Sequence, residues 1–204
     1  MTKAGLGRRI GLFGGSFNPV HHGHLSLAES ARQLLHLDEI VFIPTHQNPF
    51  KSREDLIPSR DRLAMLRLAI ADNPHFSVNP LEIERAGTSY TVDTLRALRE
   101  EYGPDADFCF LMGADNLKDF PRWREPDTIV EMVRLGIFAR PGYRLPELPA
   151  AYAGRIEVIP TILIDLSATA LRGFLRKGLS PRYLIPDSVL SFIEDKGLYR
   201  EAVG

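Results

Sequence analysis

Short apolar runs alternate with stretches of helical periodicity along most of the chain. Runs of Ile, Val, Leu and Phe predict strands, and apolar residues three or four positions apart predict helices. The predicted strands span residues 9–13, 39–44, 108–113, 136–139 and 156–159, and residues 76–84 are expected to be extended. The predicted helices span residues 22–35, 91–102, 127–133, 168–177 and 188–196, and a further helix begins at Ser59.

Glycines mark the ends of three of these helices. Gly103, which precedes Pro104, and also Gly178 and Gly197 each follow a predicted helix, where a residue without a β-carbon ends the helical turn. Strands that alternate with helices predict crossover connections, and therefore a mainly parallel sheet with helices on both faces. Ligands of such sheets bind at the carboxyl ends of the strands. We expect a doubly wound α/β fold with a small C-terminal helical portion, as a single domain over residues 1–204.

Composition narrows the functional classes. The 204 residues are 44% hydrophobic and 25% charged, which is typical of a soluble globular domain. Lys and Arg number 25 against 26 Asp and Glu, so there is no excess of positive charge for binding a nucleic acid. Cys109 has no partner for a disulfide, which favours a reducing compartment. Residues 1–9 lack a signal-peptide core and no apolar run approaches the ~20 residues of a membrane helix, so we expect a cytoplasmic protein.

The strongest chemical signal lies between the first predicted strand and the first predicted helix. Gly14 and Gly15 follow the strand directly, and a glycine pair lets the backbone approach a ligand closely. The helix that follows offers unpaired N–H groups and a positive dipole end to a phosphate. His21 and His24 are three positions apart, so both imidazoles lie on one face of the first helical turn. This pattern predicts a phosphate site.

Two other interpretations of these residues remain. The glycines and histidines could form a turn that only caps the helix. A zinc site is a weaker rival, because His36, His46 and His75 are dispersed and no Cys or Glu completes a ligand set.

Four later positions carry weaker signals, each with a structural alternative. Ser167 is a plausible N-cap, and Thr169 lies in the first turn of the helix that follows. This second helix start could face a phosphate. A capped amphipathic helix without a ligand explains the same pattern. Asp115, at the end of a strand, could bind ribose or cap a helix. Trp123, the only tryptophan, lies in a predicted loop and could stack on a base or plug the core.

The segment from Gly14 to His24 resembles the signature of the H-x-G-H nucleotidyltransferase superfamily. The chain as a whole resembles the bacterial nicotinate-nucleotide adenylyltransferases. The matching motifs, whose order and spacing are specific only together, are Pro49-Phe50-Lys51, Ser89-Tyr90-Thr91, Gly113-Ala114-Asp115, Trp123, Arg140-Pro141-Gly142, Ser167 to Arg172, Leu184-Ile185-Pro186 and Leu198-Tyr199. The chain departs from the family at Phe50, where many relatives have histidine, and at Ala168, where many have a second serine.

The resemblance implies a Rossmann-like nucleotidyltransferase domain that transfers the adenylyl group of ATP to nicotinic acid mononucleotide, forming deamido-NAD and pyrophosphate. It implies catalytic roles for His21, His24 and Arg172. The ATP-binding residues that it implies are Gly14, Gly15, Ser16, Phe17, His24, Gly113, Asp115, Arg140, Ser167, Thr169 and Arg172. The mononucleotide-binding residues that it implies are Asn18, Lys51, Ser89, Tyr90, Thr91 and Trp123. Mg²⁺ is expected to arrive on the ATP phosphates, without a protein ligand.

Alternative acceptors and a different class of function stay open at this point. Nicotinamide mononucleotide is the closest rival acceptor, and phosphopantetheine is a more distant one. A nucleotide sensor without turnover is the rival from a different class, although His21, His24 and Arg172 are all present. The expected partners are therefore ATP and the mononucleotide, with no nucleic acid or membrane, and homo-oligomerisation is left open.

Overall fold

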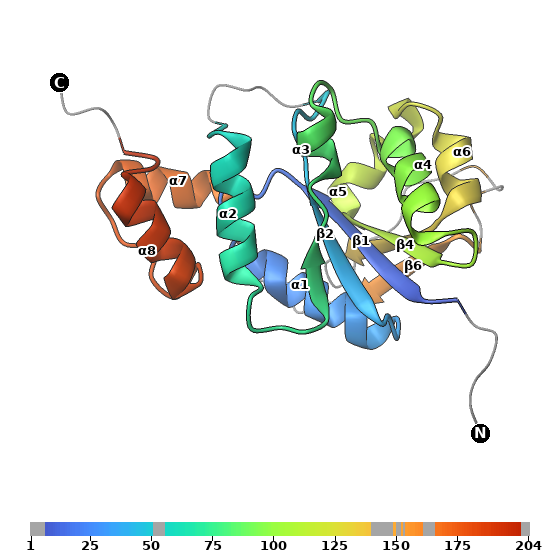
Figure 1. Cartoon of the computed structure of the whole chain (residues 1–204), viewed down its shortest axis with the longest axis horizontal. Coiled ribbons are helices and arrows are strands. Elements are labelled where there is room, and N and C mark those ends of the chain that lie inside the picture. Colours follow the sequence, from blue (N-terminus) through green and yellow to red (C-terminus); the bar gives the residue numbers. More distant parts are fainter. Residues whose placement is uncertain are drawn as a thin grey trace.

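A computed structural model describes residues 7–50, 56–139, 149, 152, 154–160 and 166–200. Its centre is a parallel six-stranded sheet in the order β3-β2-β1-β4-β5-β6 (Figure 1). The strands are β1 (Arg9–Gly15), β2 (Glu39–Pro44), β3 (Phe76–Val78), β4 (Asp107–Gly113), β5 (Arg134–Ala139) and β6 (Ile156–Pro160). The strand order and the crossover helices confirm the expected Rossmann-like, doubly wound α/β fold.

Alternation along each strand divides the core into two layers. In β4, Phe108 and Phe110 face one layer, whereas Cys109 and Leu111 face the other. Successive side chains of a strand point to opposite faces, so a strand buried on both faces is apolar throughout. This explains why the predicted strands appear in the sequence as continuous apolar runs.

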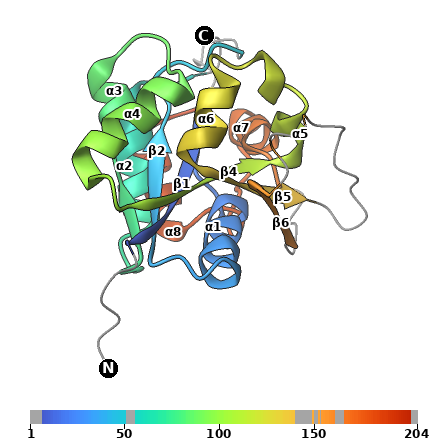
Figure 2. The same ribbon diagram turned by 90° about the vertical axis from the view of Figure 1, so that its right-hand side faces the viewer.

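The helices cover both faces of this sheet. The layer that contains Cys109 and Leu111 is closed by α1 (His22–Leu34), α2 (Ser59–Ala69), α7 (Ala168–Arg176) and α8 (Asp187–Lys196). The opposite layer is closed by α3 (Leu81–Arg85), α4 (Thr91–Tyr102), α5 (Ala114–Leu117) and α6 (Pro126–Met132). Figure 2 shows α1 on the opposite side of the sheet from α4 and α6. The expected C-terminal helical portion is α7 and α8, and α8 packs against α2.

The predicted helix ends are confirmed at the three glycines. Gly103 is the C-cap of α4 with φ 83°, and Gly197 is the C-cap of α8 with φ 62°. Gly178 follows the C-cap of α7 and has φ 69°. These values lie in the left-handed region, which glycine occupies without steric cost.

Two expectations about local structure were wrong. Residues 76–84 are extended only as far as Val78, and α3 then begins at Leu81. The change of direction is made by Asn79, whose Oδ1 accepts a hydrogen bond from the Leu81 amide at 3.0 Å, and by Pro80 as the N-cap. The region before Trp123 is not a plain loop, because it contains α5 and a 3₁₀ turn at Phe120–Arg122.

The fold generates a prediction about the sheet, where Gly136 lies in β5. A β-carbon there would lie 2.7 Å from Leu111 Cδ2 and 3.1 Å from Cys109 Sγ, both in the core. We expect Gly136→Ala to lower the free energy of unfolding by about 1–3 kcal/mol in urea denaturation, because overpacking forces neighbouring side chains off their rotamers.

Gly173→Ala is the matched control for this substitution. Gly173 lies inside α7, and a β-carbon there would meet no described atom within 4 Å. The control should therefore leave stability unchanged or raise it by up to about 1 kcal/mol, since alanine favours helix. Equal stability of Gly136→Ala and the unsubstituted protein would contradict the close approach.

Candidate active site

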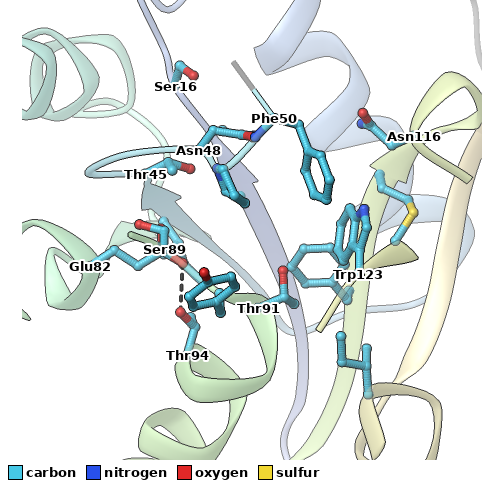
Figure 3. Close-up of a pocket in the computed structure, with 18 of the residues that line it drawn as sticks. Ser16, Thr45, Asn48, Phe50, Glu82, Ser89, Thr91, Thr94, Asn116 and Trp123 are labelled. Atoms are coloured by element: carbon cyan, nitrogen blue, oxygen red, sulfur yellow. Dashed lines mark hydrogen bonds between the residues drawn. The ribbon is translucent and has the colours of Figure 1, made fainter. Parts of the chain in front are cut away.

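A cavity of about 410 Å³ opens at the carboxyl ends of β1 and β4. The strand order reverses between these strands, so their crossover helices leave on opposite faces and the space above the strand ends is not covered. The wall is formed by the end of β1 with Gly14, Gly15 and Ser16, by the end of β4, by residues 45 and 48–50, by the start of α4, and by residues 122–124. Figure 3 shows Ser16, Thr45 and Asn48 on one side of this cavity and Trp123 on the other.

Gly14 and Gly15 are the last two residues of β1, so the strand runs two residues further than the sequence predicted and the chain leaves the sheet at Ser16. This glycine turn, at residues 14–16, is held by the aromatic core beneath it. A β-carbon on Gly15 would lie 3.0 Å from the Phe17 ring, so glycine lets the chain turn closely over this ring. The Phe17 side chain is buried, with its ring centroid 5.8 Å from that of Phe13 and 5.7 Å from that of Phe42. Phe17 has φ 45°, a conformation that a bulky residue keeps only where its surroundings enforce it. Only the backbone of Phe17 is therefore suited to bind a ligand.

His21 and His24 are brought together as the sequence predicted, and they also cap α1. The His24 amide donates to His21 Nδ1 at 3.4 Å, and the His21 amide donates to His24 Nδ1 at 3.3 Å. The two rings stack with centroids 3.7 Å apart. Because each Nδ1 accepts a hydrogen bond, the ring proton of each neutral imidazole lies on Nε2. The pair therefore combines a capping role with two Nε2–H donors.

Burial keeps His21 uncharged at neutral pH. The side chain is almost fully buried, and this desolvation, helped by the charge of neighbouring His22, lowers the pKa of His21 to about 4. A neutral His21 preserves the Nδ1 lone pair that caps α1.

The start of α7 is connected to the loop that leads into α1. Ser167 Oγ accepts from the Ala170 amide at 3.2 Å, which confirms that Ser167 is the N-cap of α7. Arg172 Nη1 donates to the Asn18 carbonyl at 3.0 Å, and Nη2 lies 3.3 Å from Thr169 Oγ1. The late Ser-x-Thr-x-x-Arg motif is therefore connected to the loop that follows the glycine turn.

The start of α4 presents backbone donors to the cavity. Ser89, Tyr90 and Thr91 all line the wall, and Tyr90 is the N-cap, without a side-chain hydrogen bond that caps the helix. Ser89 Oγ instead accepts from the His46 amide at 3.2 Å. The N-cap side chain therefore does not cap the first amides of α4, and among the described residues this positive helix end lines the cavity.

Trp123 forms the aromatic part of the wall. Its ring centroid is 6.1 Å from that of Phe110 and 5.3 Å from that of Phe120, and it is half-buried. Beside it, the Arg124 guanidinium lies 4.9 Å above the Tyr90 ring and 3.2 Å from Asp93 Oδ2. Trp123 combines core packing with a surface exposed to the cavity.

Several predicted residues lie elsewhere. Asp115 is exposed and does not line the cavity, whereas its neighbour Asn116 does. His21, His24, Asn18, Ser167, Thr169 and Arg172 lie outside the cavity wall, in the polar cluster at the starts of α1 and α7. Lys51 and Arg140 lie outside the described residues.

The cavity also contains polar residues that the sequence analysis missed. Thr45, Asn48, Glu82, Thr94 and Asn116 line the wall. Glu82 is 7% exposed, and its Oε1 accepts from the Thr94 hydroxyl at 2.7 Å, the dashed contact in Figure 3. The sequence could have indicated these residues by one feature, because they follow strands β2 and β4 or lie close to the start of α4.

Metal-binding clusters and membrane-spanning helices are both absent from the described ranges. Within them, no group of three or more His, Cys, Asp or Glu side chains is placed to hold a metal ion. None of their helices has both the length and the apolar character needed to cross a membrane.

Comparison with known proteins gives consistent matches. The cytidylyltransferase-like family model matches residues 12–174. A probable nicotinate-nucleotide adenylyltransferase of Thermomicrobium roseum is 42% identical over 198 residues, covering 94% of this chain and 92% of that protein. The corresponding protein of Herpetosiphon aurantiacus is also 42% identical, over 94% of this chain and 98% of that protein.

Among solved structures, the chain is similar to Plasmodium falciparum nicotinic acid mononucleotide adenylyltransferase complexed with NaAD. The TM-score is 0.78 at 22% identity, over 94% of this chain and 97% of that chain. At this identity the likeness concerns the fold.

The low pKa of His21 generates a prediction about stability. The folded value of about 4 lies below the ordinary value of 6.5, so the unfolded chain binds a proton first as the pH falls. The contribution of neutral His21 to the free energy of unfolding is complete above pH 6.5 and is lost as the pH falls toward 4. We expect the unfolding free energy of the protein to fall by about 2 kcal/mol more than that of His21→Asn between pH 7 and pH 5.

Asparagine is the appropriate replacement because it caps a helix without titrating in this range. The measurement is urea denaturation at several pH values. Parallel pH profiles for the two proteins would contradict a buried, neutral His21.

Proposed function

The chain belongs to the cytidylyltransferase-like family and, within it, to the nicotinate-nucleotide adenylyltransferases, and we propose that it transfers the adenylyl group of ATP to nicotinic acid mononucleotide. The products are nicotinic acid adenine dinucleotide and pyrophosphate. The observation that carries this assignment of the acceptor is the start of α4, where the N-cap side chain makes no capping hydrogen bond and which lines the same cavity as the glycine turn at the end of β1.

ATP is bound chiefly through its phosphates. The glycine turn, at Gly14, Gly15 and Ser16, provides close backbone approach, and the Phe17 amide follows it. The Nε2–H groups of His21 and His24 face the α-phosphate and the bridging oxygen, where charge develops during transfer. Ser167, Thr169 and Arg172 bind the β- and γ-phosphates from the start of α7. Of the remaining ATP-binding assignments, Gly113 and Asp115 serve the ribose, and Arg140 serves the adenine.

The mononucleotide occupies the part of the cavity between α4 and Trp123. Its pyridine ring stacks on Trp123, and its carboxylate accepts hydrogen bonds at Ser89, Tyr90 and Thr91. Asn18 and Lys51 bind its phosphate. The charges of the wall support an anionic acceptor. Among the described lining residues two are arginines, Arg122 and Arg124, and one is a carboxylate, Glu82.

The reaction is a direct in-line transfer. A phosphate oxygen of the mononucleotide attacks the α-phosphorus of ATP, and the bond from that phosphorus to the pyrophosphate oxygen breaks as the new bond forms. No protein nucleophile is required, so the chain contributes position and charge stabilisation. Magnesium enters as part of the substrate MgATP, held by phosphate oxygens whose charge it neutralises.

We place the protein in the cytoplasm, since Cys109 is a buried free thiol.

A comparison of two acceptors tests this proposal. Backbone N–H groups at the start of α4 favour a carboxylate, whereas the NH₂ of a carboxamide would place donor against donor. We expect kcat/KM for nicotinic acid mononucleotide to exceed that for nicotinamide mononucleotide about a hundredfold or more, measured at one pH and one magnesium concentration. Equal kcat/KM values for the two acceptors, or a preference for the amide, would contradict an anion site at the start of α4.

Trp123→Ala tests the place of the pyridine ring. Stacking of a base on an aromatic side chain contributes about 1–3 kcal/mol, so KM for the mononucleotide should rise about tenfold or more while KM for ATP stays nearly constant. Trp123→Phe, which keeps an aromatic face, is the control and should recover most of the loss. If both KM values rise together, Trp123 supports the wall through Phe110 and Phe120 and does not stack on the acceptor.

A further inference from the structure

A buried arginine supports the glycine turn from below. Arg62 lies on α2, and its side chain has no exposed surface. Its Nη1 donates to the Ser16 carbonyl at 2.6 Å, and its Nη2 donates to Ser59 Oγ at 3.0 Å. The first bond joins α2 to a loop 46 residues earlier in the chain, at the residue that ends the glycine turn.

Stability alone is a poor explanation for this arginine. Among the described residues no carboxylate forms an ion pair with Arg62, and its Nε has no hydrogen-bond partner. Burial lowers the pKa of Arg62, and this effect is opposed in part by the negative charge of Glu82. A buried charge without an ion pair lowers the free energy of unfolding, and hydrogen bonds to one carbonyl and one hydroxyl offset only part of this cost. What these bonds do provide is a fixed direction for the Ser16 carbonyl.

The bond to Ser16 fixes the direction of one peptide group. In a trans peptide the carbonyl and the next N–H point in opposite directions. With the Ser16 carbonyl directed at Arg62, the Phe17 N–H is directed away from α2. The same bond supports the left-handed conformation of Phe17, at φ 45°.

A tyrosine near the C-terminus supports the next part of the loop. Tyr199 follows α8, and its hydroxyl donates to Asn18 Oδ1 at 2.8 Å, across 181 residues of sequence. Burial raises the pKa of Tyr199 well above its usual range, so the hydroxyl remains a donor. The link is anchored further by Lys196 Nζ, which lies 3.3 Å from Asp61 Oδ1 and ties α8 to α2.

We infer that Arg62 and Tyr199 are positioning residues for adenylyl transfer: Arg62 orients the Ser16 carbonyl and Tyr199 orients the Asn18 side chain. This inference rests on the proposed function. Neither residue lines the cavity, so each acts through the loop residue that it holds.

The first test compares Arg62→Met with Arg99→Met. Arg99 is a matched control, because it also donates to backbone carbonyls, those of Gly103, Pro104, Ala106 and Met132, but at the opposite ends of the strands. We expect Arg62→Met to lower kcat about tenfold or more at saturating substrates, since a displacement of about 1 Å in a reacting geometry can cost a hundredfold. Arg99→Met should lower only the unfolding temperature. Rates are measured where circular dichroism shows every variant folded.

Arg62→Lys keeps the charge and one donor, so it should recover part of the lost kcat. If Arg62→Met does not fold, Arg62→Lys is compared with the unsubstituted protein and should still show a lowered kcat. An unchanged kcat in either folded variant would overturn the role of Arg62.

The second test is Tyr199→Phe, which removes only the hydroxyl. Asn18 is assigned to binding of the mononucleotide. In Tyr199→Phe, KM for the mononucleotide should therefore rise by about tenfold, while KM for ATP changes less than twofold. Tyr152→Phe is the control, because the Tyr152 hydroxyl donates to Asp127 Oδ1 at 2.7 Å, away from this loop. A purely structural role of Tyr199 would leave both KM values unchanged or raise them together, and either result would overturn it.

Different results would contradict the proposed function and the positioning roles of Arg62 and Tyr199. If the unsubstituted protein releases no pyrophosphate from ATP and the mononucleotide, the proposed function is wrong, and the positioning inference falls with it. If the unsubstituted protein is active and Arg62→Met and Tyr199→Phe match their controls, only the positioning inference is wrong.

Discussion

The parallel pairing of β1 with β4 is the constraint on which the rest of the structure depends. It places β1 in the centre of the sheet, with β2 on one side and β4 on the other. The connections that leave β1 and β4 then run on opposite faces, which opens a crevice at the carboxyl ends of these two strands. The cavity, the glycine turn and the uncapped start of α4 all take their places from this reversal of strand order.

The site that forms at this reversal offers anions fixed N–H donors in addition to the side chains of Arg122 and Arg124. The Nδ1 atoms of His21 and His24 cap α1, which directs the Nε2 atoms outward, and the starts of α1, α4 and α7 contribute backbone dipoles. Donors of this kind are fixed before a substrate binds, and little reorganisation is needed when charge develops on a phosphate. The buried guanidinium of Arg62 fits the same scheme, since it bonds to the protein backbone beneath the loop.

Much of the candidate site could be predicted from the sequence because its main parts are local. The glycine pair, the two histidines and the Ser-x-Thr-x-x-Arg motif each lie within a few residues, at the junction of a strand or loop with a helix. The residues that were missed come from separate segments: Thr45 and Asn48 follow β2, Glu82 lies on α3 and Asn116 on α5. Asp115 and Asn116 are neighbours, and the turn of α5 decides which of them lines the cavity. The roles assigned to individual residues remain predictions.

The sequence by itself determined the strands, most helices and the helix ends, because apolar periodicity and glycines act over a few residues and are satisfied locally. It did not determine α3, where Asn79 and Pro80 redirect an extended segment, or the turns before Trp123. Only the tertiary structure decided that Arg62 reaches Ser16 and that Tyr199 reaches Asn18. Such contacts leave no periodic trace in the sequence, since they join residues that the packing of α2 and α8 brings under one loop.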